Sequence, residues 1–376
     1  MMHLYGSLKQ VHARTGDSNL VSYPRKEFAT SAVWDTFVDK HPSGAWWHRQ
    51  AWIDYSLAYD RKAIDRSFAV VSESAGYPFI VGLCPAIERD GVVCMGDNPC
   101  AGPLIAAQGK MSAARSQACQ DAMVSSIKKM LGGIEVQWRW DRYPNDYRNT
   151  IGDLAKSLGL RYETWDTSVV KVWGGRELGV TARDVTHDSR CRDEPMRQWL
   201  SMRKSYRSLI KKTAREHTIG WGTDYLWPHF ELCHRQTATR PRDGETYKHQ
   251  LKWLRQGHAY IMAAFPKIGG TEGAMDQDGL VASPLSWPVV GSSPTPSTIL
   301  SAAYVIAYKG HGYYASGPSL KKGLQHALQW GAMQVMSNVL HGDSYEVGWL
   351  KEDGIGFFKG GFGGDRCGVD VLRGTI

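Results

Sequence analysis

The residue best placed for chemistry is Lys359, which stands among aromatic residues and glycines near the C-terminus. Phe357 and Phe358 precede it, and Phe362 follows within the stretch that ends at Gly364. Ammonium groups are attracted to aromatic faces, and glycine lets a ligand approach the backbone closely. An ammonium held in this way suits an anion, or an oxyanion that develops during a reaction. A surface turn with a solvated lysine is the competing interpretation.

Candidate proton carriers fall on strands that we expect beside this lysine. Glu346 lies in a predicted strand over 345–348, and Tyr313 and Tyr314 follow an earlier buried strand. Successive side chains on a strand point to opposite faces, so at most one of the two tyrosines can line a site. Asp353, beside the same strands, is a fourth candidate. Capping or strand pairing is the competing role for all four residues, and it is the preferred role for Asp353.

A candidate anion site follows the same strand. Ser316 and Gly317 lie between the predicted strand over 300–308 and a predicted helix over 320–340. The start of a helix offers unpaired N–H groups to an anion. We therefore expect Ser316 and Gly317 to contact a phosphate group of a substrate.

The strongest charge asymmetry lies between Arg197 and Arg215, where seven Lys or Arg residues occur without an acidic residue. The apolar residues of the segment 196–217 recur at helical spacing. A second stripe runs beside them and consists of Arg203, Arg207, Lys211 and Arg215. Such a stripe favours an anionic partner such as a phosphorylated molecule or RNA. A solvated helix face is the competing interpretation.

The overall composition is that of an ordinary globular protein. The chain has 376 residues, 42% hydrophobic and 22% charged, with a formal net charge of +8. That length exceeds what one core usually supports and predicts two domains. No apolar run approaches the ~20 residues of a membrane span, and the N-terminal segment lacks the apolar middle of a secretory signal.

The motifs that would indicate other chemistries are missing from the sequence. The seven cysteines form no C-x-x-C pair, which favours free thiols in a reducing cytoplasm. There is no H-E-x-x-H, no phosphate-binding G-x-x-x-x-G-K-[ST] and no G-x-S-x-G. The sequence therefore predicts a cytoplasmic protein with no metal site, no tightly bound cofactor and no covalent acyl-enzyme.

Helices and strands alternate along both halves of the chain. In the first half, Gly132 and Gly133 end a helix, and the strict alternation that follows predicts a strand with one buried face. The helices predicted here cover 28–38, 50–56, 112–131 and 151–158, and the strands cover 68–71, 77–84, 91–95, 134–140 and 161–173. In the second half, the predicted helices cover 196–217, 227–237, 246–256 and 320–340, and the strands cover 258–265, 300–308, 345–348 and 356–359.

Several of these stretches together resemble the FemABX family of peptidyltransferases. The stretches are Tyr313-Tyr-Ala-Ser-Gly-Pro318, the helix from Leu324 to Ala332, Tyr345-Glu-Val-Gly348 and Phe358-Lys-Gly-Gly-Phe-Gly-Gly364. The basic helix from Met202 to Lys212 is similar to the helix that opens the second domain in that family. Trp34-Asp-Thr-Phe-Val38, with the tryptophans at 46, 47 and 52, is similar to its N-terminal opening, which makes Trp34 a candidate substrate contact.

The resemblance implies an α/β (α+β) fold with two tandem acetyltransferase-like (GNAT) domains, each a mixed twisted sheet flanked by helices. We expect domains over 1–165 and 166–376, with the transfer site in the second and the last strand able to pair back with the first. It also implies an acyltransferase that forms an amide bond between an activated carbonyl and a primary amine. Phe358 and Lys359 match the pair that lies at the transfer site in the family.

The donor and the acceptor stay open at this point. The Q/R-x-x-G-x-G/A signature of acetyl-CoA enzymes is absent near Ser316, which favours an aminoacyl-tRNA as co-substrate over an acyl-CoA. The basic stripe would then follow the tRNA backbone. The acceptor would be an amine-bearing small molecule, including a nucleotide-linked cell-wall precursor. A CoA-dependent N-acyltransferase and a non-catalytic RNA-binding protein are the alternatives.

Overall fold

The computed structural model describes residues 20–27, 31–73, 79–94, 100–106, 112–141, 148–172, 199–238, 242–267, 299–349 and 354–376. The chain divides into two compact units. Unit 1 comprises residues 1–165 together with 368–376, and unit 2 comprises residues 166–367. Candidate residue Asp353 lies outside the described residues, as do all of residues 173–198 and 268–298.

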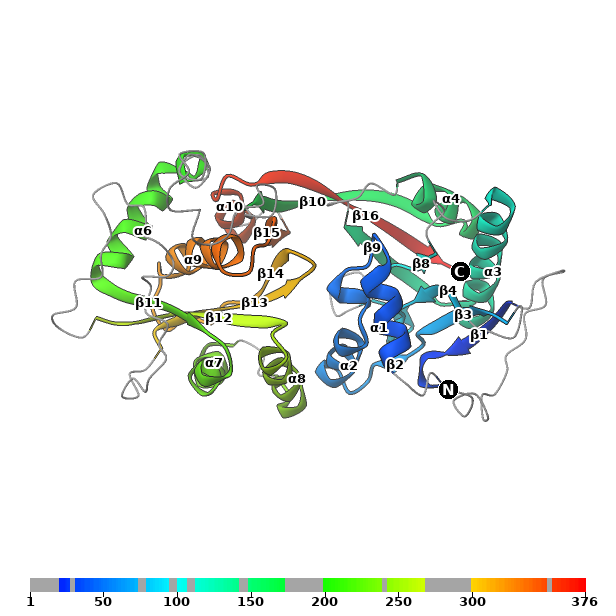
Figure 1. Cartoon of the computed structure of the whole chain (residues 1–376), viewed down its shortest axis with the longest axis horizontal. Helices are drawn as coiled ribbons and strands as arrows, with labels where there is room; N and C mark the ends of the chain where they lie inside the picture. The colour runs from blue at the N-terminus through cyan, green and yellow to red at the C-terminus, as the bar shows by residue number, and fades with distance from the viewer. Residues whose placement is uncertain are drawn as a thin grey trace. The chain divides into compact units, whose positions relative to one another are not determined.

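Unit 1 contains two groups of strands with helices packed against them (Figure 1). The helices are α1 (Ser31–Lys40), α2 (Gln50–Tyr59), α3 (Ala113–Leu131) and α4 (Arg148–Leu158). One sheet has the order β1-β3-β4-β8, with bounds Leu20–Pro24, Phe68–Ser72, Phe79–Cys84 and Leu104–Ile105. The other strands are β2 (Ile64–Asp65), β5 (Ile87–Arg89), β6 (Val92–Val93), β7 (Cys100–Ala101) and β9 (Glu135–Asp141).

The boundaries of α3 show why local signals predicted this part well. The Ser112 Oγ accepts a hydrogen bond from the Arg115 backbone N–H at 3.3 Å, which caps the first turn. The helix ends at Leu131 with Gly132 as its C-cap, and Gly133 takes the left-handed conformation with φ of +80°. Strand β9 follows at once, and its side chains Val136, Trp138 and Trp140 are buried. The predicted helix over 112–131 and strand over 134–140 are confirmed.

The C-terminal strand β16 (Asp365–Thr375) is an element that the sequence did not reveal. In unit 1 it pairs antiparallel with β9, from Val369 opposite Asp141 to Thr375 opposite Glu135. Its partner lies more than two hundred residues earlier in the chain. Pairing between such distant segments leaves no local pattern in the sequence.

Unit 2 is built on a sheet with the order β11-β12-β13-β14-β15-β10 (Figure 1). Neighbouring strands run antiparallel except β14 and β15, which run parallel. The bounds in sheet order are His217–Gly222, Ala259–Pro266, Ser301–Tyr308, His311–Ser316, Ser344–Trp349 and Arg161–Lys171. The central strands β12 and β13 confirm the strands predicted over 258–265 and 300–308.

Helices cover both faces of this sheet. They are α6 (Lys204–Glu216), α7 (Trp227–Thr237), α8 (Gly244–Arg255), α9 (Gln325–Asn338) and α10 (Gly354–Gly360). On one face Ala303 and Val305 of β13 share a core with α6 and α9. On the other face Tyr304 contacts Trp227 and Phe230 of α7. Strand β13 is therefore buried on both sides, which explains its continuous apolar sequence.

One predicted strand of unit 2 is wrong. The segment over 356–359 belongs to helix α10. The glycines that flank Phe357-Phe358-Lys359 suggested a turn followed by a strand. Isolated helices this short are marginal in water and depend on tertiary contacts, and those contacts come from α6, as described below.

No helix in the described part of the chain has the length and apolar character that crossing a membrane requires.

Candidate active site

The parallel pairing of β14 and β15 stops in the middle of both strands. It covers three positions, of which the last joins Tyr313 to Glu346. Near that point the β13–β14 register shifts between Tyr304 and Val305, and the β10–β15 register shifts between Ser168 and Val169. Such irregularities bend a strand and interrupt its ladder, and they are frequent beside active sites. Tyr313 and Glu346 lie at this interruption, and Lys359 contacts β15 two residues beyond Glu346, at Gly348.

Lys359 reaches the end of β15 from helix α10. A Cβ atom added to Gly348 would lie 2.8 Å from the Lys359 Nζ, so the ammonium rests against bare backbone. Gly348 also has φ of +99°, a conformation that residues with side chains rarely adopt. The lysine side chain is half-buried. Half-burial and the contact with Gly348 therefore fix the position of the Lys359 ammonium.

Helix α10 is fixed by the start of α6. The Arg203 Nη1 donates to the Phe357 carbonyl at 3.0 Å, and the Tyr206 hydroxyl donates to the Phe358 carbonyl at 3.0 Å. The Arg203 backbone N–H donates to the Gly361 carbonyl at 3.0 Å. The last carbonyls of a helix have no partner within it, and a cation near them is favourable. Arg203 and Tyr206 thus hold the helix that carries Lys359.

The sequence suggested that the glycines after Lys359 let a ligand approach the backbone. In the structure they make room for other parts of the protein instead. A Cβ on Gly361 would lie 2.2 Å from the Tyr206 ring, and one on Gly363 would lie 2.4 Å from the Ser201 Oγ. A Cβ on Gly364 would lie 2.8 Å from the Val169 carbonyl oxygen. These glycines admit other parts of the protein, and Gly348 is the glycine that lies at the ammonium.

The three phenylalanines that were predicted to stand around Lys359 do not share one environment. Phe358 and Phe362 are 5.2 Å apart and pack around His326 of α9, which lies 4.9 Å from Phe358 and 4.3 Å from Tyr206. Phe357 is 64% exposed. Burial lowers the pKa of His326, although a hydrogen bond to the Gly323 carbonyl opposes this shift. His326 is therefore neutral at pH 7 and was missed because no motif marks it.

Glu346 is a buried acid within a network of side chains. Its Oε1 accepts a hydrogen bond from the Thr167 hydroxyl at 2.8 Å, and its Oε2 lies 3.7 Å from the His311 Nε2. The other ring nitrogen of His311 is hydrogen-bonded to the Ser344 hydroxyl. His311 was not identified from the sequence. It connects Glu346 of β15 to the first residue of the neighbouring strand β14.

The two tyrosines point to opposite faces of β14, as the alternation of a strand requires. The Tyr313 ring packs on His311 with centroids 4.3 Å apart, on the Glu346 face. The Tyr314 hydroxyl points toward α9 and lies 3.4 Å from the Gln325 Oε1. Burial raises the pKa of Tyr314, so its hydroxyl stays protonated at neutral pH.

Ser316 and Gly317 end β14, but they do not start a helix. Helix α9 begins at Gln325, later than the predicted start at residue 320. Both residues are half-buried. A Cβ on Gly317 would lie 1.8 Å from the Tyr314 hydroxyl, so the glycine makes room for that side chain. An anion site built on the helix N-terminus is therefore not supported at these two residues.

The basic stripe lies along α6, with Arg203 as the residue that precedes its first turn. Arg207 and Lys211 are half-buried, and Arg215 is exposed. None of the four forms an ion pair with a carboxylate among the described residues. The stripe is thus connected to α10 through Arg203 and is otherwise open to an anionic partner.

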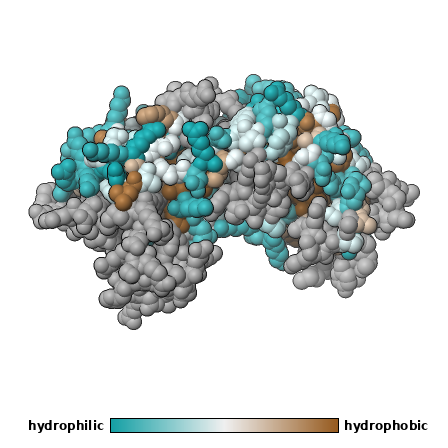
Figure 2. Space-filling model, turned by 90° about the horizontal axis from the view of Figure 1, so that it is seen from above, coloured by the Kyte–Doolittle hydropathy of each residue, from teal (hydrophilic) through white to brown (hydrophobic). Residues whose placement is uncertain are grey.

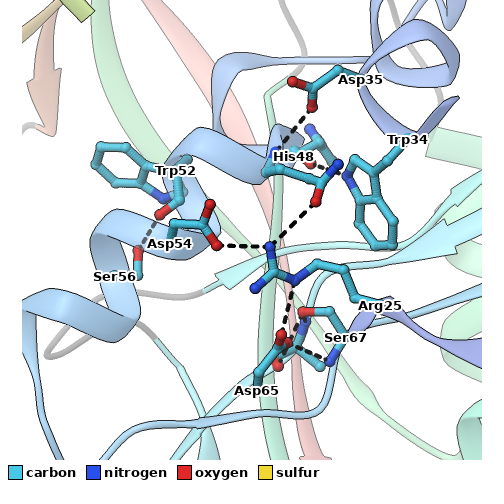
Figure 3. A network of polar contacts seen from close by, with 11 residues as sticks. Arg25, Trp34, Asp35, His48, Trp52, Asp54, Ser56, Asp65 and Ser67 are labelled. Atoms are coloured by element: carbon cyan, nitrogen blue, oxygen red, sulfur yellow. Dashed lines mark hydrogen bonds and ion pairs between the residues drawn. The ribbon is translucent and has the colours of Figure 1, made fainter. Parts of the chain in front are cut away.

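Trp34 belongs to the core of unit 1. Its side chain is fully buried, and its indole N–H donates to the His48 carbonyl at 2.8 Å (Figure 3). In the same region Arg25 bridges Asp54 and Asp65, each at 2.8 Å. These contacts are those of a packed interior. The structure does not support a substrate contact at Trp34.

Comparisons with known proteins bear on the fold. No protein-family model matches the sequence. No curated protein matches it either. Among solved structures, the chain is similar to FemX, at 13% identity over 91% of this chain and 95% of that chain, with a TM-score of 0.55. It is also similar to a tandem GNAT protein from the clavulanic acid biosynthesis pathway, at 9% identity over 95% and 98% of the chains and a TM-score of 0.48.

A third similar structure is L-PGS from Bacillus licheniformis, at 11% identity over 77% of this chain and 80% of that chain, with a TM-score of 0.44. The similarity to FemX over nearly the whole of both chains shows a shared fold. The mixed α/β architecture expected from the sequence is therefore confirmed, and the chain shares the fold of FemX.

Proposed function

We propose that this protein is an aminoacyltransferase that moves an amino acid from an aminoacyl-tRNA to a primary amine of a small acceptor. The observation that carries the proposal is the placement of the Lys359 ammonium against the Gly348 backbone, where the β14–β15 ladder ends. A fold shared with FemX supports the proposal but does not by itself establish a function.

The reaction needs one positive site and one route for a proton. The amine nitrogen attacks the ester carbonyl, a C–N bond forms, and the C–O bond to the tRNA ribose breaks. The amine loses a proton, and the released ribose hydroxyl gains one. Negative charge collects on the carbonyl oxygen between these steps, and a preorganised cation stabilises it. Lys359 is the group that we assign to this oxygen, with Phe358 fixing its helix.

Glu346 is the candidate for the proton route. Glu346 is hydrogen-bonded to Thr167 and lies next to His311, so a proton taken up there has two polar neighbours. Tyr314, which the sequence had also suggested for this role, keeps its proton at neutral pH and points to the opposite face of β14, so it is not assigned to the route. Tyr313 lies on the Glu346 face and would contact the acceptor. Ser316 and Gly317, at the end of β14, would contact the donor.

Two observations bear on the identity of the donor. The stripe residues Arg203, Arg207, Lys211 and Arg215 lack ion-pair partners among the described residues, which favours a long polyanion such as tRNA. An acyl-CoA donor is the second candidate, because β14 and β15 diverge and an extended chain with amide groups could pair with their edges. Either donor is available in the cytoplasm, where we expect the protein to act.

An assay for amide-bound label separates these candidates. The protein is incubated with tRNAs that carry radiolabelled amino acids and with a small-molecule cell extract as the source of amines. Label that survives mild alkali is counted, because amides persist while aminoacyl esters hydrolyse. The proposal predicts alkali-stable label that disappears when the tRNA is first digested with RNase. Label that forms only from acyl-CoA supports the second candidate, and no transfer from either donor contradicts both.

A further inference from the structure

The end of α10 carries an aromatic ring that the proposed chemistry does not use. Phe357 has an exposed fraction of 64%, the highest of any large hydrophobic side chain that the structure describes. The neighbouring Phe358 and Phe362 pack inward, and Phe362 is fully buried. Exposing an apolar ring of this size to water costs free energy, on the order of 2 kcal/mol relative to burial. The ring is therefore a candidate contact for a partner.

Arg203 lies on this ring and holds it in place. The guanidinium carbon is 3.7 Å from the Phe357 ring centroid, and the Arg203 Nη1 donates to the Phe357 carbonyl at 3.0 Å. Arg203 forms no ion pair with a described carboxylate. The guanidinium plane and the phenyl ring thus make a rigid, positively charged surface. Bases stack on aromatic rings and on guanidinium planes of this kind.

The stacked pair stands at one end of a row of cations. From Arg203 to Arg215 the four stripe residues recur every four positions, about 6 Å apart along the helix axis. Like charges at this spacing destabilise an isolated helix by about 0.2–0.5 kcal/mol per pair. Seen from above, the α6 side of unit 2 shows hydrophilic side chains, with neutral and hydrophobic ones between them (Figure 2). An anionic backbone along α6 would neutralise the row.

We infer that Phe357 and Arg203 form a platform for an unpaired nucleobase at the end of an RNA whose phosphates follow α6. Stacking supplies affinity for the unpaired end, and the cations supply affinity that does not depend on sequence. The inference deepens the proposed function and rests on it for the choice of RNA, since the amino acid of an aminoacyl-tRNA is attached to an unpaired 3′ end. Phe357 belongs to the same helix as Lys359.

Fluorescence anisotropy on the full chain tests the platform. Two labelled RNA hairpins with the same stem are compared, one with a four-nucleotide unpaired 3′ end that finishes in CCA and one that is blunt. The wild-type protein is expected to bind the first more tightly. Phe357→Ala should weaken binding of the first hairpin by roughly 5–100-fold, as expected for one lost base stack, and leave the blunt hairpin unchanged. Phe357→Trp should retain the preference, whereas Phe357→Leu should lose it.

Two control variants show whether the effect of Phe357→Ala comes from lost stacking, from a folding defect or from changed electrostatics. Leu232→Ala removes another exposed apolar side chain, on α7, and should change neither affinity. The double variant Arg207→Ala with Lys211→Ala should weaken both hairpins and reduce the salt dependence of binding. Thermal melting of each variant confirms that it is folded.

Equal binding of the two hairpins by the wild type, or an unchanged affinity of Phe357→Ala for the unpaired end, overturns the inference. An acidic peptide that competes with the hairpin equally in wild type and Phe357→Ala also overturns it, because the surface would then recognise charge alone. RNase-sensitive amide formation without an effect of Phe357→Ala leaves the proposed function intact. If Phe357→Ala weakens binding of the unpaired end alone but the protein forms no amide, the platform stands and the proposed reaction is contradicted.

Discussion

At the scale of residues, the central feature is a lysine whose amine is placed by a glycine. Gly348 lacks the Cβ that would meet the Lys359 Nζ, and it has a backbone conformation that suits glycine. The sequence pointed to Lys359 because of its type and neighbours. It did not point to Gly348, because the contact depends on how a helix and a strand meet. His311 and His326 escaped notice for the same reason.

Gly348→Ala should reduce transfer activity and stability together. The left-handed conformation costs a residue with a side chain roughly 1–2 kcal/mol, and the new methyl group displaces the ammonium. We expect a lower urea midpoint and a drop in the rate of alkali-stable label formation. Gly152→Ala is the control, because nothing lies within 4 Å of a Cβ there and alanine favours a helix. A Gly348→Ala enzyme with wild-type rate and stability would contradict this account of the site.

At the scale of elements, the packing of α10 on α6 decides where Lys359 stands. Local patterns predicted β9, β12, β13 and the basic helix, because their periodicity is internal. They failed for α10, whose helix depends on bonds from Arg203 and Tyr206. They also failed for β16, whose pairing with β9 spans most of the chain. Elements that rely on distant partners leave little signal in their own residues.

Gly361→Ala should loosen this packing. The added methyl group would lie 2.2 Å from the ring of the buried Tyr206, and overpacking of this kind costs roughly 1–3 kcal/mol. Urea denaturation measures the loss. A double-mutant cycle with Tyr206→Leu identifies the cause, because the smaller side chain should relieve part of the clash. Strictly additive losses in the cycle would show that the ring is not what Gly361 accommodates.

At the scale of the whole molecule, buried histidines make the stability depend on pH. Burial, and secondarily Arg242 and Arg235, lowers the pKa of His234 to about 4, and its Nδ1 lies 2.9 Å from the Tyr247 hydroxyl. An unfolded histidine has a pKa of about 6.5. Between these values the unfolded chain binds a proton that the folded chain does not, so stability falls as the pH decreases. Burial also lowers the pKa of His217 and of His326, in the same direction.

From these values His234 should lower the free energy of unfolding by roughly 2 kcal/mol between pH 7 and pH 5. Urea denaturation at the two pH values measures this difference. His234→Gln removes the titrating group and keeps a polar side chain, so the difference should shrink. A variant whose stability falls with pH as steeply as that of the wild type would show that His234 does not titrate in this range.

The most direct test of the account is the rate at which Lys359→Met forms alkali-stable label from aminoacyl-tRNA. Loss of a group that stabilises an oxyanion lowers rates by about 100–1,000-fold, and we expect a loss of that size with hairpin binding unchanged. Lys359→Arg keeps the charge and should retain part of the activity, while Lys252→Ala, at an exposed position on α8, should retain all of it. Transfer by Lys359→Met at the wild-type rate would contradict the proposal that this ammonium stabilises the reacting carbonyl.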